Sequence, residues 1–587
     1  MLKSIFLPVA LIAFVVSSHA QTDNNNIVFS ETYELANVIL ALTPYGISDP
    51  LEVQKGTPYY EEVMAHFKGM KTHPLLEKVN YSRERWAEYL SFRTDAFAFE
   101  IGADGVIRRS FPFYANQGQK PFDDHLALVQ DFYKKSGFHD FYQSHQPYYD
   151  GIVRRYRSYF MMDEMRRFLE EEFGVFQQNE KNLVVLSPLV NRMNCHRNLD
   201  KTTSADFATL AISLIAPDEN SGTDDAQQAS DIHMLFTEMN HGYVNPVSRQ
   251  HAKLIARNFK YKLWDNKSGY THADCFNEYM TWAVYDLFVW QYFPQHAAQT
   301  TRDWHLQNNN RGFIASSLFG KKLRELYEAR QKGQAVRDLY PALLEWTASV
   351  QKTLRMPVLA ADSMVISAVH AAEAFEIPFT EPLKKLPMID CGLFKVENGE
   401  RKIIRHLTLE EGKNLFFKGK TLRVAVPGGI PPEPGLYGLN FNTWGWKHEL
   451  TSESGVSLKC PSRFYIRIKA PTTQELCMQN VIALDDSLGR LRNHACERIS
   501  MSETIKNYVS ALESIPFNGC PANFADGFKQ HCAAWLALLP FTDRHPELRG
   551  EMHVLFKQLE TGHDGEAFKA GVKKVWDTWD LVEKAWR

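Results

Sequence analysis

The spacing of hydrophobic positions changes along the 587 residues and divides the chain into three predicted parts. Up to about residue 375 apolar side chains mostly recur every three to four residues, the spacing of one helical face. Residues 388 to about 480 read as short strands separated by turns, and from residue 502 helical spacing returns. We therefore predict a multidomain α+β protein with a small β-rich domain, a sandwich or barrel, between two helical parts.

Composition and prolines set the limits of these parts. A chain of 587 residues is too long for one compact core. Three prolines fall within residues 378–387, which we interpret as a domain boundary. The predicted domains are an α-rich domain over residues 21–380, a β-rich domain over 388–480 and a C-terminal helical region over 490–587.

Several shorter segments carry expectations of their own. Residues 183–186 (Leu-Val-Val-Leu) are the clearest strand of the first part, and residues 95–111 indicate a hairpin or a loop at a helix end. Residues 274–290 and 360–375 have helical spacing. The net charge of −3 gives no electrostatic reason to expect nucleic acid or an anionic membrane as partner.

The first twenty residues predict a secretory signal peptide. Lys3 supplies a positive charge, residues 5–16 are apolar, and Ser18-His19-Ala20 has the small-x-small pattern of a cleavage site. No later stretch has about 20 consecutive apolar residues, so we expect no integral membrane segment after signal removal. The mature protein is expected to be exported, periplasmic or extracellular, and soluble.

Cysteine usage fits export. Six of the eight cysteines lie after residue 390, and an even number in an exported protein permits disulfides. We expect disulfides among these six. Cys195 and Cys275 are expected to be buried and free, or paired with each other.

The segment that carries candidate chemistry is residues 231–241. Its apolar residues form one stripe at helical spacing, which predicts a core-facing helix; they are Ile232, Leu235, Phe236 and Met239. Thr237, Glu238 and His241 fall on roughly the opposite side. Gly242 is the expected helix end, and Pro246 is expected to prevent the helix from resuming.

The polar face resembles an incomplete zinc motif. A metallopeptidase helix places two histidines four residues apart so that both imidazoles reach one zinc, with a glutamate beside the first as general base. Glu238 and His241 occupy the second and last places of that pattern, and Thr237 occupies the first. Glu278, on the next predicted helix, follows His241 by 37 residues, a spacing typical of zinc peptidases whose third ligand is a glutamate.

Residues from about 30 to 350 resemble a bacterial secreted domain family of unknown function whose members are similar to glutamate-zincin metallopeptidases. The matching pieces are Val-Leu-Ser-Pro-Leu-Val at 185–190, Glu-Met-Asn-His-Gly-Tyr-Val-Asn-Pro at 238–246, Glu278, Gly-Phe-Ile at 312–314 and Leu-Tyr-Glu-Ala-Arg at 326–330. The resemblance implies a zincin-like, thermolysin-like fold, in which the strand at 183–186 corresponds to an edge strand beside the metal helix. It also implies Glu238 as general base, His241 and Glu278 as metal ligands, zinc as cofactor, and a peptide or protein as substrate.

Thr237 departs from this pattern, because a neutral hydroxyl is a poor zinc ligand. His233 lies about 12 Å from His241 along the helix, so both cannot bind one ion. His272 and Asp274 could substitute if their loop folds inward, and Glu238, His241 and Glu278 could instead hold another metal, since Glu-x-x-His is a di-iron-type spacing. We expect weak or lost zinc binding and weak or lost gluzincin-type peptide hydrolysis. The alternative is a non-catalytic pseudo-peptidase that binds a peptide or protein.

Overall fold

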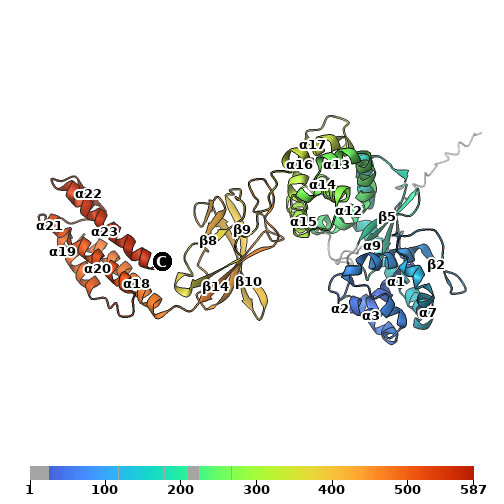
Figure 1. Ribbon diagram of the computed structural model, residues 1–587, viewed down its shortest axis with the longest axis horizontal. Coiled ribbons are helices and arrows are strands. Elements are labelled where there is room, and N and C mark those ends of the chain that lie inside the picture. The colour runs from blue at the N-terminus through green and yellow to red at the C-terminus, as the bar shows by residue number, and fades with distance from the viewer. Residues whose placement is uncertain are drawn as a thin grey trace, which may run out of the picture. The chain divides into compact units, whose positions relative to one another are not determined.

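The computed structural model describes residues 25–586 except 117, 178–179, 192–193, 209–223 and 266. The chain is a multidomain α+β protein that divides into two compact units (Figure 1). Unit 1 comprises Met1–Arg355 with Ser454–Ser457, and unit 2 comprises Met356–Glu453 with Leu458–Arg587. The predicted signal peptide at residues 1–20 lies outside the described residues.

The first half of unit 1 is a set of helices around an aromatic-rich core. Helix α1 is buried on almost every face, as expected for an element hydrophobic all round. Strands β2 (Phe99–Ile101) and β3 (Ile107–Arg109) pair antiparallel, so of the two predicted alternatives for residues 95–111 the structure has the hairpin. The helices are α1 (Glu31–Leu42), α2 (Pro44–Ser48), α3 (Pro58–His66), α4 (Pro74–Lys78), α5 (Trp86–Asp95), α6 (Pro121–Asp124), α7 (Leu126–Ser136), α8 (Phe138–Ser144), α9 (Gln146–Tyr159) and α10 (Met162–Phe173).

A four-stranded sheet with the order β1-β4-β6-β5 joins the two halves of unit 1. Its strands are β1 (Asn25–Val28), β4 (Lys181–Leu186), β5 (Cys195–Asn198) and β6 (Thr203–Ala208). Strand β4 confirms the strand predicted at residues 183–186. However, β4 pairs with β1 on one side and with β6 on the other, so the expectation of an edge strand there is wrong. The residues of β4 do not alternate between buried and exposed, because the strand has a neighbour on each side and is covered on both faces of the sheet. The two edge strands are β1 and β5, and β5 runs antiparallel to β6.

The second half of unit 1 is helical. Its elements are α12 (Asp225–Gln250), α13 (Ala252–Asn258), the 3₁₀ helix η5 (Tyr261–Leu263), α14 (His272–Tyr292), α15 (Ala297–Arg311), α16 (Ser316–Glu328) and α17 (Tyr340–Val350). Helix α12 packs against α14 and also contacts strands β5 and β6. The side chain of Asp224 caps its start by accepting a hydrogen bond from the Ala226 N–H.

Helix α12 corrects the predicted helix end at Gly242. The helix continues to Gln250 and contains Pro246 in its interior. Continuation buries Gly242, Val244 and Val247, and this packing outweighs the hydrogen bond that Pro246 cannot donate. In a helix, residue 246 would donate its N–H to the carbonyl of residue 242. Pro246 cannot donate, so the hydrogen bond is lost at Gly242, a residue without a side chain.

Unit 2 begins with a β-rich part. One sheet has the order β10-β9-β13-β14-β7 and the other β11-β12-β8. The strands are β7 (Ser363–Ser367), β8 (Phe375–Pro378), β9 (Met388–Glu397), β10 (Glu400–Glu410), β11 (Leu415–Lys418), β12 (Thr421–Val424), β13 (Gly435–Phe441) and β14 (Ser462–Lys469). The helix predicted at residues 360–375 is wrong, because β7 lies there and pairs parallel with β14. Met364 and Ile366 pack on the core whereas Val365 is 53% exposed, a two-residue alternation.

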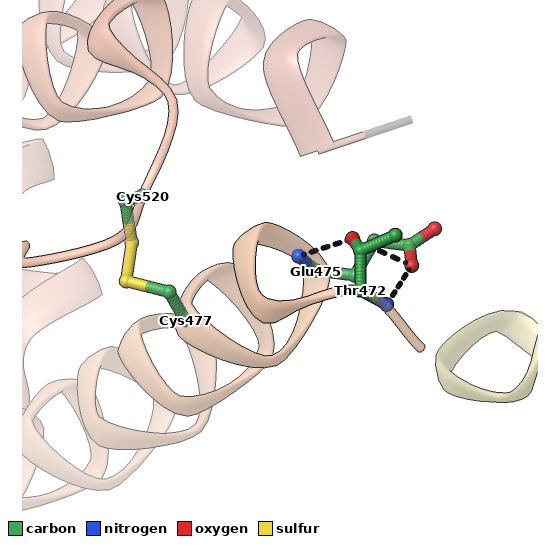
Figure 2. Close-up of a disulfide and its surroundings, with 4 residues drawn as sticks. All are labelled: Thr472, Glu475, Cys477 and Cys520. Atoms are coloured by element: carbon green, nitrogen blue, oxygen red, sulfur yellow. Dashed lines mark hydrogen bonds between the residues drawn. A yellow bond between two sulfur atoms is a disulfide. The ribbon is translucent and has the colours of Figure 1, made fainter. Parts of the chain in front are cut away.

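The rest of unit 2 is a helical bundle. Its helices are α18 (Thr473–Ala495), α19 (Met501–Glu513), α20 (Ala522–Leu536), α21 (Leu539–Thr542), α22 (Met552–Glu560) and α23 (Gly565–Trp586). Helix α18 begins at Thr473, before the predicted limit of the β-rich domain at residue 480. Thr472 and Glu475 form a capping box at its start (Figure 2). In the described parts of the chain, no helix combines the length and the apolar composition needed to cross a membrane.

A disulfide joins the first turns of α18 to the segment before α20. It links Cys477 to Cys520 (Figure 2), which confirms a disulfide among the six late cysteines. The remaining six cysteines are buried. Cys460 Sγ donates to the Asn442 carbonyl at 2.7 Å, and the free thiols are Cys195, Cys275, Cys391, Cys496 and Cys532.

Candidate functional site

Helices α12 and α14 bring two of the predicted site residues together. The Nε2 atom of His241 on α12 lies 3.5 Å from Oε1 of Glu278 on α14. Two ligands of one tetrahedral zinc, each bonded at about 2.0–2.1 Å, lie roughly 3.4 Å apart. The two side chains are 18% and 12% exposed, so both groups retain limited contact with solvent.

A threonine orients His241. Thr281 Oγ1 donates to the Asn277 carbonyl (2.7 Å) and lies 3.5 Å from His241 Nδ1, from which it can accept. With the Nδ1–H directed at Thr281, Nε2 is the nitrogen presented to Glu278. Asn240 ties the two helices at the same level, because its Nδ2 donates to the Thr281 carbonyl at 3.1 Å. Thr281 belongs to no sequence motif, and Asn240 occupies an unspecified position of Glu-x-x-His. The role of both residues depends on a contact between helices.

Thr237 does not complete a ligand set. Its side chain is 5% exposed and its Oγ1 donates to the carbonyl of Met234, 3.1 Å away on the same helix. A catalytic zinc normally keeps three protein ligands, and this chain aligns only His241 and Glu278. Within the ranges that the structure describes, no group of three or more histidine, cysteine, aspartate or glutamate side chains is placed to hold a metal ion. With a threonine hydroxyl at the first position, the side chains at 237, 241 and 278 do not supply the three ligands of a catalytic zinc.

Glu238 is a partly buried carboxyl with an altered affinity for protons. Burial is the largest cause that raises its pKa from 4.5 to about 7, and the negative charges of Glu278 and Asp206 act in the same direction. The positive charges of His241 and Arg197 oppose them. Near neutral pH Glu238 therefore exchanges its proton readily, as general acid–base chemistry requires.

The sheet supplies charged groups close to Glu238. Asp206 on β6 is fully buried and accepts hydrogen bonds from His196 Nδ1 at 2.7 Å and Asn182 Nδ2 at 3.0 Å. Arg197 follows His196 on the edge strand β5. Sequence reasoning missed this group because β5 and β6 carry no distinctive pattern, although the strand at residues 183–186 pointed to a sheet nearby.

Tyr270 adds a phenol from the loop before α14. The negative charge of Glu278 is the largest cause that raises the Tyr270 pKa, followed by burial, while Arg311 opposes the shift. The phenol is therefore neutral and can donate a hydrogen bond. Its ring packs on Phe313 with centroids 5.6 Å apart. Loop residues carry no periodic signal, so this position had no sequence signature.

The other sequence candidates lie elsewhere. His233 is 2% exposed and stacks on Trp304, with ring centroids 3.6 Å apart. His272 and Asp274 are exposed at the start of α14, and the His272 ring contacts Tyr261 at 4.8 Å. The proposed substitution of these residues for the missing ligand has no support, because His272 faces Tyr261 instead.

These features define an α+β domain with a carboxylate–imidazole site held between two packed helices. Residues 31–346 match the family described as "Domain of unknown function (DUF4932)", and the chain belongs to that family. No curated protein matches the chain.

Solved structures give only a distant likeness. The S-layer protein SbsC matches at 10% identity and a TM-score of 0.15, over 75% of this chain and 45% of that one. The N-terminal part of SbsC matches at 10% identity and the same TM-score of 0.15, over 75% of this chain and 78% of that one. The chain thus spans less than half of the longer S-layer chain, and TM-scores this low carry no argument about fold or function.

Proposed function

We propose that unit 1 is a zincin-like, gluzincin-related metallopeptidase domain whose zinc site is degenerate, so that peptide hydrolysis is weak or lost. One observation carries this proposal. His241 Nε2 and Glu278 Oε1 lie 3.5 Å apart, at the spacing of two zinc ligands, whereas Thr237 at the first ligand position donates its hydroxyl to Met234. The domain retains the framework of a metal site without its third ligand.

The residues that remain support proton transfer and hydrogen bonding to a peptide. Glu238, with a pKa of about 7, can take or give a proton near neutral pH. Tyr270 can donate a hydrogen bond to a carbonyl oxygen, and His241 presents Nε2 beside Glu278. Without a group that polarises the scissile carbonyl, these contacts bind a peptide more effectively than they cleave it.

A gain-of-function experiment tests the proposal. Hydrolysis of a fluorescently labelled unstructured protein is measured with zinc for the unmodified protein and for Thr237→His. We expect near-background hydrolysis by the first and a clear gain by the second, because the new imidazole lies one turn from His241. Glu238→Gln in the Thr237→His background should remove the gain. Zinc-dependent hydrolysis by the unmodified protein equal to that of Thr237→His would overturn the proposal.

The second candidate is a pseudo-peptidase that binds peptides without cleaving them. It is favoured by the short edge strand β5, which contacts the helix that carries Glu238 and is the terminal strand of its sheet. An extended peptide can add to such an edge through main-chain hydrogen bonds. Fluorescence anisotropy of a labelled unstructured peptide, in the presence of a chelator, tests this function. Absence of peptide binding would remove this second candidate.

We also propose that the protein is exported to the periplasm or the medium, where its partner is a peptide or protein. The proposal depends on residues 1–20 alone. N-terminal sequencing of the mature protein should begin at Gln21. A mature protein that still begins at Met1 in the cytoplasm would contradict export.

A further inference from the structure

Unit 1 has a surface pocket that is separate from the residues gathered around His241 and Glu278. The pocket has a volume of about 460 Å³ and lies where α13, η5 and the first turn of α14 meet. Its apolar wall consists of Ala252, Ile255, Ala256, Phe259 and Ala273. Phe259 and Ile255 are almost completely buried and form part of the domain core, so the wall is fixed by the fold.

The polar groups of the pocket are basic. Lys260, Lys262 and His272 line it together with Tyr261, and none of its nine lining residues is acidic. Lys260 Nζ donates one hydrogen bond to the Ala256 carbonyl at 2.8 Å, which holds the ammonium group against the pocket wall. The Tyr261 ring meets His272 edge-on at 4.8 Å and orients it. An ammonium group with three donors keeps two for a ligand.

We propose that this pocket binds a small carboxylate that carries an apolar body. Its volume falls within the range of ligand pockets, about 300–1,000 Å³. The apolar wall favours a hydrocarbon or aromatic group, and the two lysines favour a negative charge on the same molecule. A cation would find no carboxylate among the lining residues, and inorganic phosphate would gain nothing from the apolar wall.

Such a ligand has two chemical sources, a free fatty acid and the C-terminal residue of a peptide. Both present one carboxylate beside an apolar group. Octanoate represents the first and N-acetyl-leucine the second, so titration with each separates them. The inference is independent of the proposed peptidase-like function, because the two sites share no residue.

Isothermal titration of the full-length protein with octanoate tests the inference. We expect one binding site, at least tenfold weaker binding of octan-1-ol, and at least tenfold weaker octanoate binding by Lys260→Met, since that variant loses a charge-assisted hydrogen bond. Ala256→Trp should abolish binding because the indole fills the pocket. Ala256 is exposed, so the larger side chain does not disturb the core.

Lys253 provides the matched control. It is exposed on the same helix α13 and does not line the pocket. Lys253→Met and Lys253→Trp should bind octanoate as the unmodified protein does. Equal affinity for octanoate and octan-1-ol, no binding of either carboxylate, or octanoate binding that Ala256→Trp leaves intact would each overturn the inference.

Discussion

The three side chains Thr237, Glu238 and His241 determine what the α12 face can do. A histidine at 237 would place a second imidazole one turn from His241, whereas the threonine hydroxyl is already engaged by Met234. Glu238 keeps the position of a general base and has a pKa of about 7. Under the proposed function, the site keeps groups that can move protons and lacks one of the three ligands of a catalytic zinc. Glu278 and Thr281 on α14 complete it.

The orientation of His241 gives a prediction for Thr281. In the Thr237→His background, Thr281→Val should weaken zinc binding about tenfold or more, because the Nδ1–H loses its acceptor and the ring its fixed direction. Thr281→Ser keeps a hydroxyl and should restore most of the affinity. Competition with a chromophoric chelator measures both. Equal zinc affinity for the valine and serine variants would show that Thr281 does not position the imidazole.

A second residue predicts how stability depends on pH. Glu34 is fully buried, and burial raises its pKa from 4.5 to about 7 against the opposing hydrogen bonds from Ser187 and Tyr59. The unfolded chain loses this proton near pH 4.5, whereas the folded protein holds it to about pH 7. The folded state is thus favoured most below pH 4.5, and the advantage is lost as the pH rises to 7.

Glu34→Gln removes this titration and keeps a neutral group of the same shape. Between pH 4 and pH 8 the free energy of unfolding of the unmodified protein should fall by about 3 kcal/mol more than that of the variant. Denaturant unfolding of unit 1 at several pH values measures the difference. Parallel pH profiles for the two proteins would contradict the raised pKa of Glu34.

At the scale of elements, the sequence predicted what hydrophobic spacing alone controls. The helix at residues 274–290, the strand at 183–186 and the hairpin near Gly105 all follow from local patterns. Gly242 and Pro246 misled the prediction because tertiary packing of α12 outweighs the local cost of both residues. The prediction of a helix at residues 360–375 was wrong because the strand there, beside β14, is half-exposed and short. Its alternation of core-facing and exposed side chains extends only over Met364, Val365 and Ile366.

The same limit applies to the site. Glu238, His241 and Glu278 could be found because their spacing along two helices has a known chemical meaning. Thr281, Tyr270 and Asp206 could not, because their proximity to the site depends on how α14, its preceding loop and β6 pack around α12. Spacing in the sequence predicts residues on one element, and contacts between elements require the fold.

A buried polar network holds α14, α15 and α16 together and gives an element-scale prediction. His305 lies 2.7 Å from Ser316 Oγ and 2.7 Å from Asp286 Oδ2. A Cβ atom at Gly320 would lie 2.2 Å from that aspartate oxygen. Gly320→Ala should therefore destabilise unit 1 by roughly 2–3 kcal/mol or more, because it breaks the Asp286–His305 contact or separates the helices.

Gly151 in α9 is the matched control, since a Cβ there would meet only the Arg154 side chain at 3.9 Å. Gly151→Ala should leave stability unchanged or raise it by up to about 1 kcal/mol through helix propensity. Denaturant unfolding compares the two variants. Equal effects of both substitutions would show that α16 does not require glycine beside Asp286.

At the scale of the whole molecule, the two compact units are expected to respond separately to changes in one of them. The Cys477–Cys520 disulfide belongs to unit 2 and closes a loop with a sequence separation of 43 residues. By chain entropy such a cross-link contributes about 4 kcal/mol. Unit 1, which contains the candidate site, contributes neither cysteine of this disulfide.

Cys477→Ser/Cys520→Ser should lower the melting temperature of the unit 2 transition and leave the unit 1 transition unchanged. Differential scanning calorimetry measures both transitions. A reducing agent should produce the same shift in the unmodified protein and none in the double variant. A shift of the unit 1 transition in the double variant would contradict the separation of the units.

The affinity for zinc tests the central claim most directly. Unmodified protein, Thr237→His, and Thr237→His/Glu278→Ala are freed of metal with a chelator and titrated with zinc against a competing chromophoric chelator. We predict weak binding by the unmodified protein, a gain of at least a hundredfold for Thr237→His, and loss of that gain when Glu278 is removed. Tight, stoichiometric zinc in the unmodified protein, abolished by His241→Ala, would contradict the account, because another residue would then serve as the third ligand.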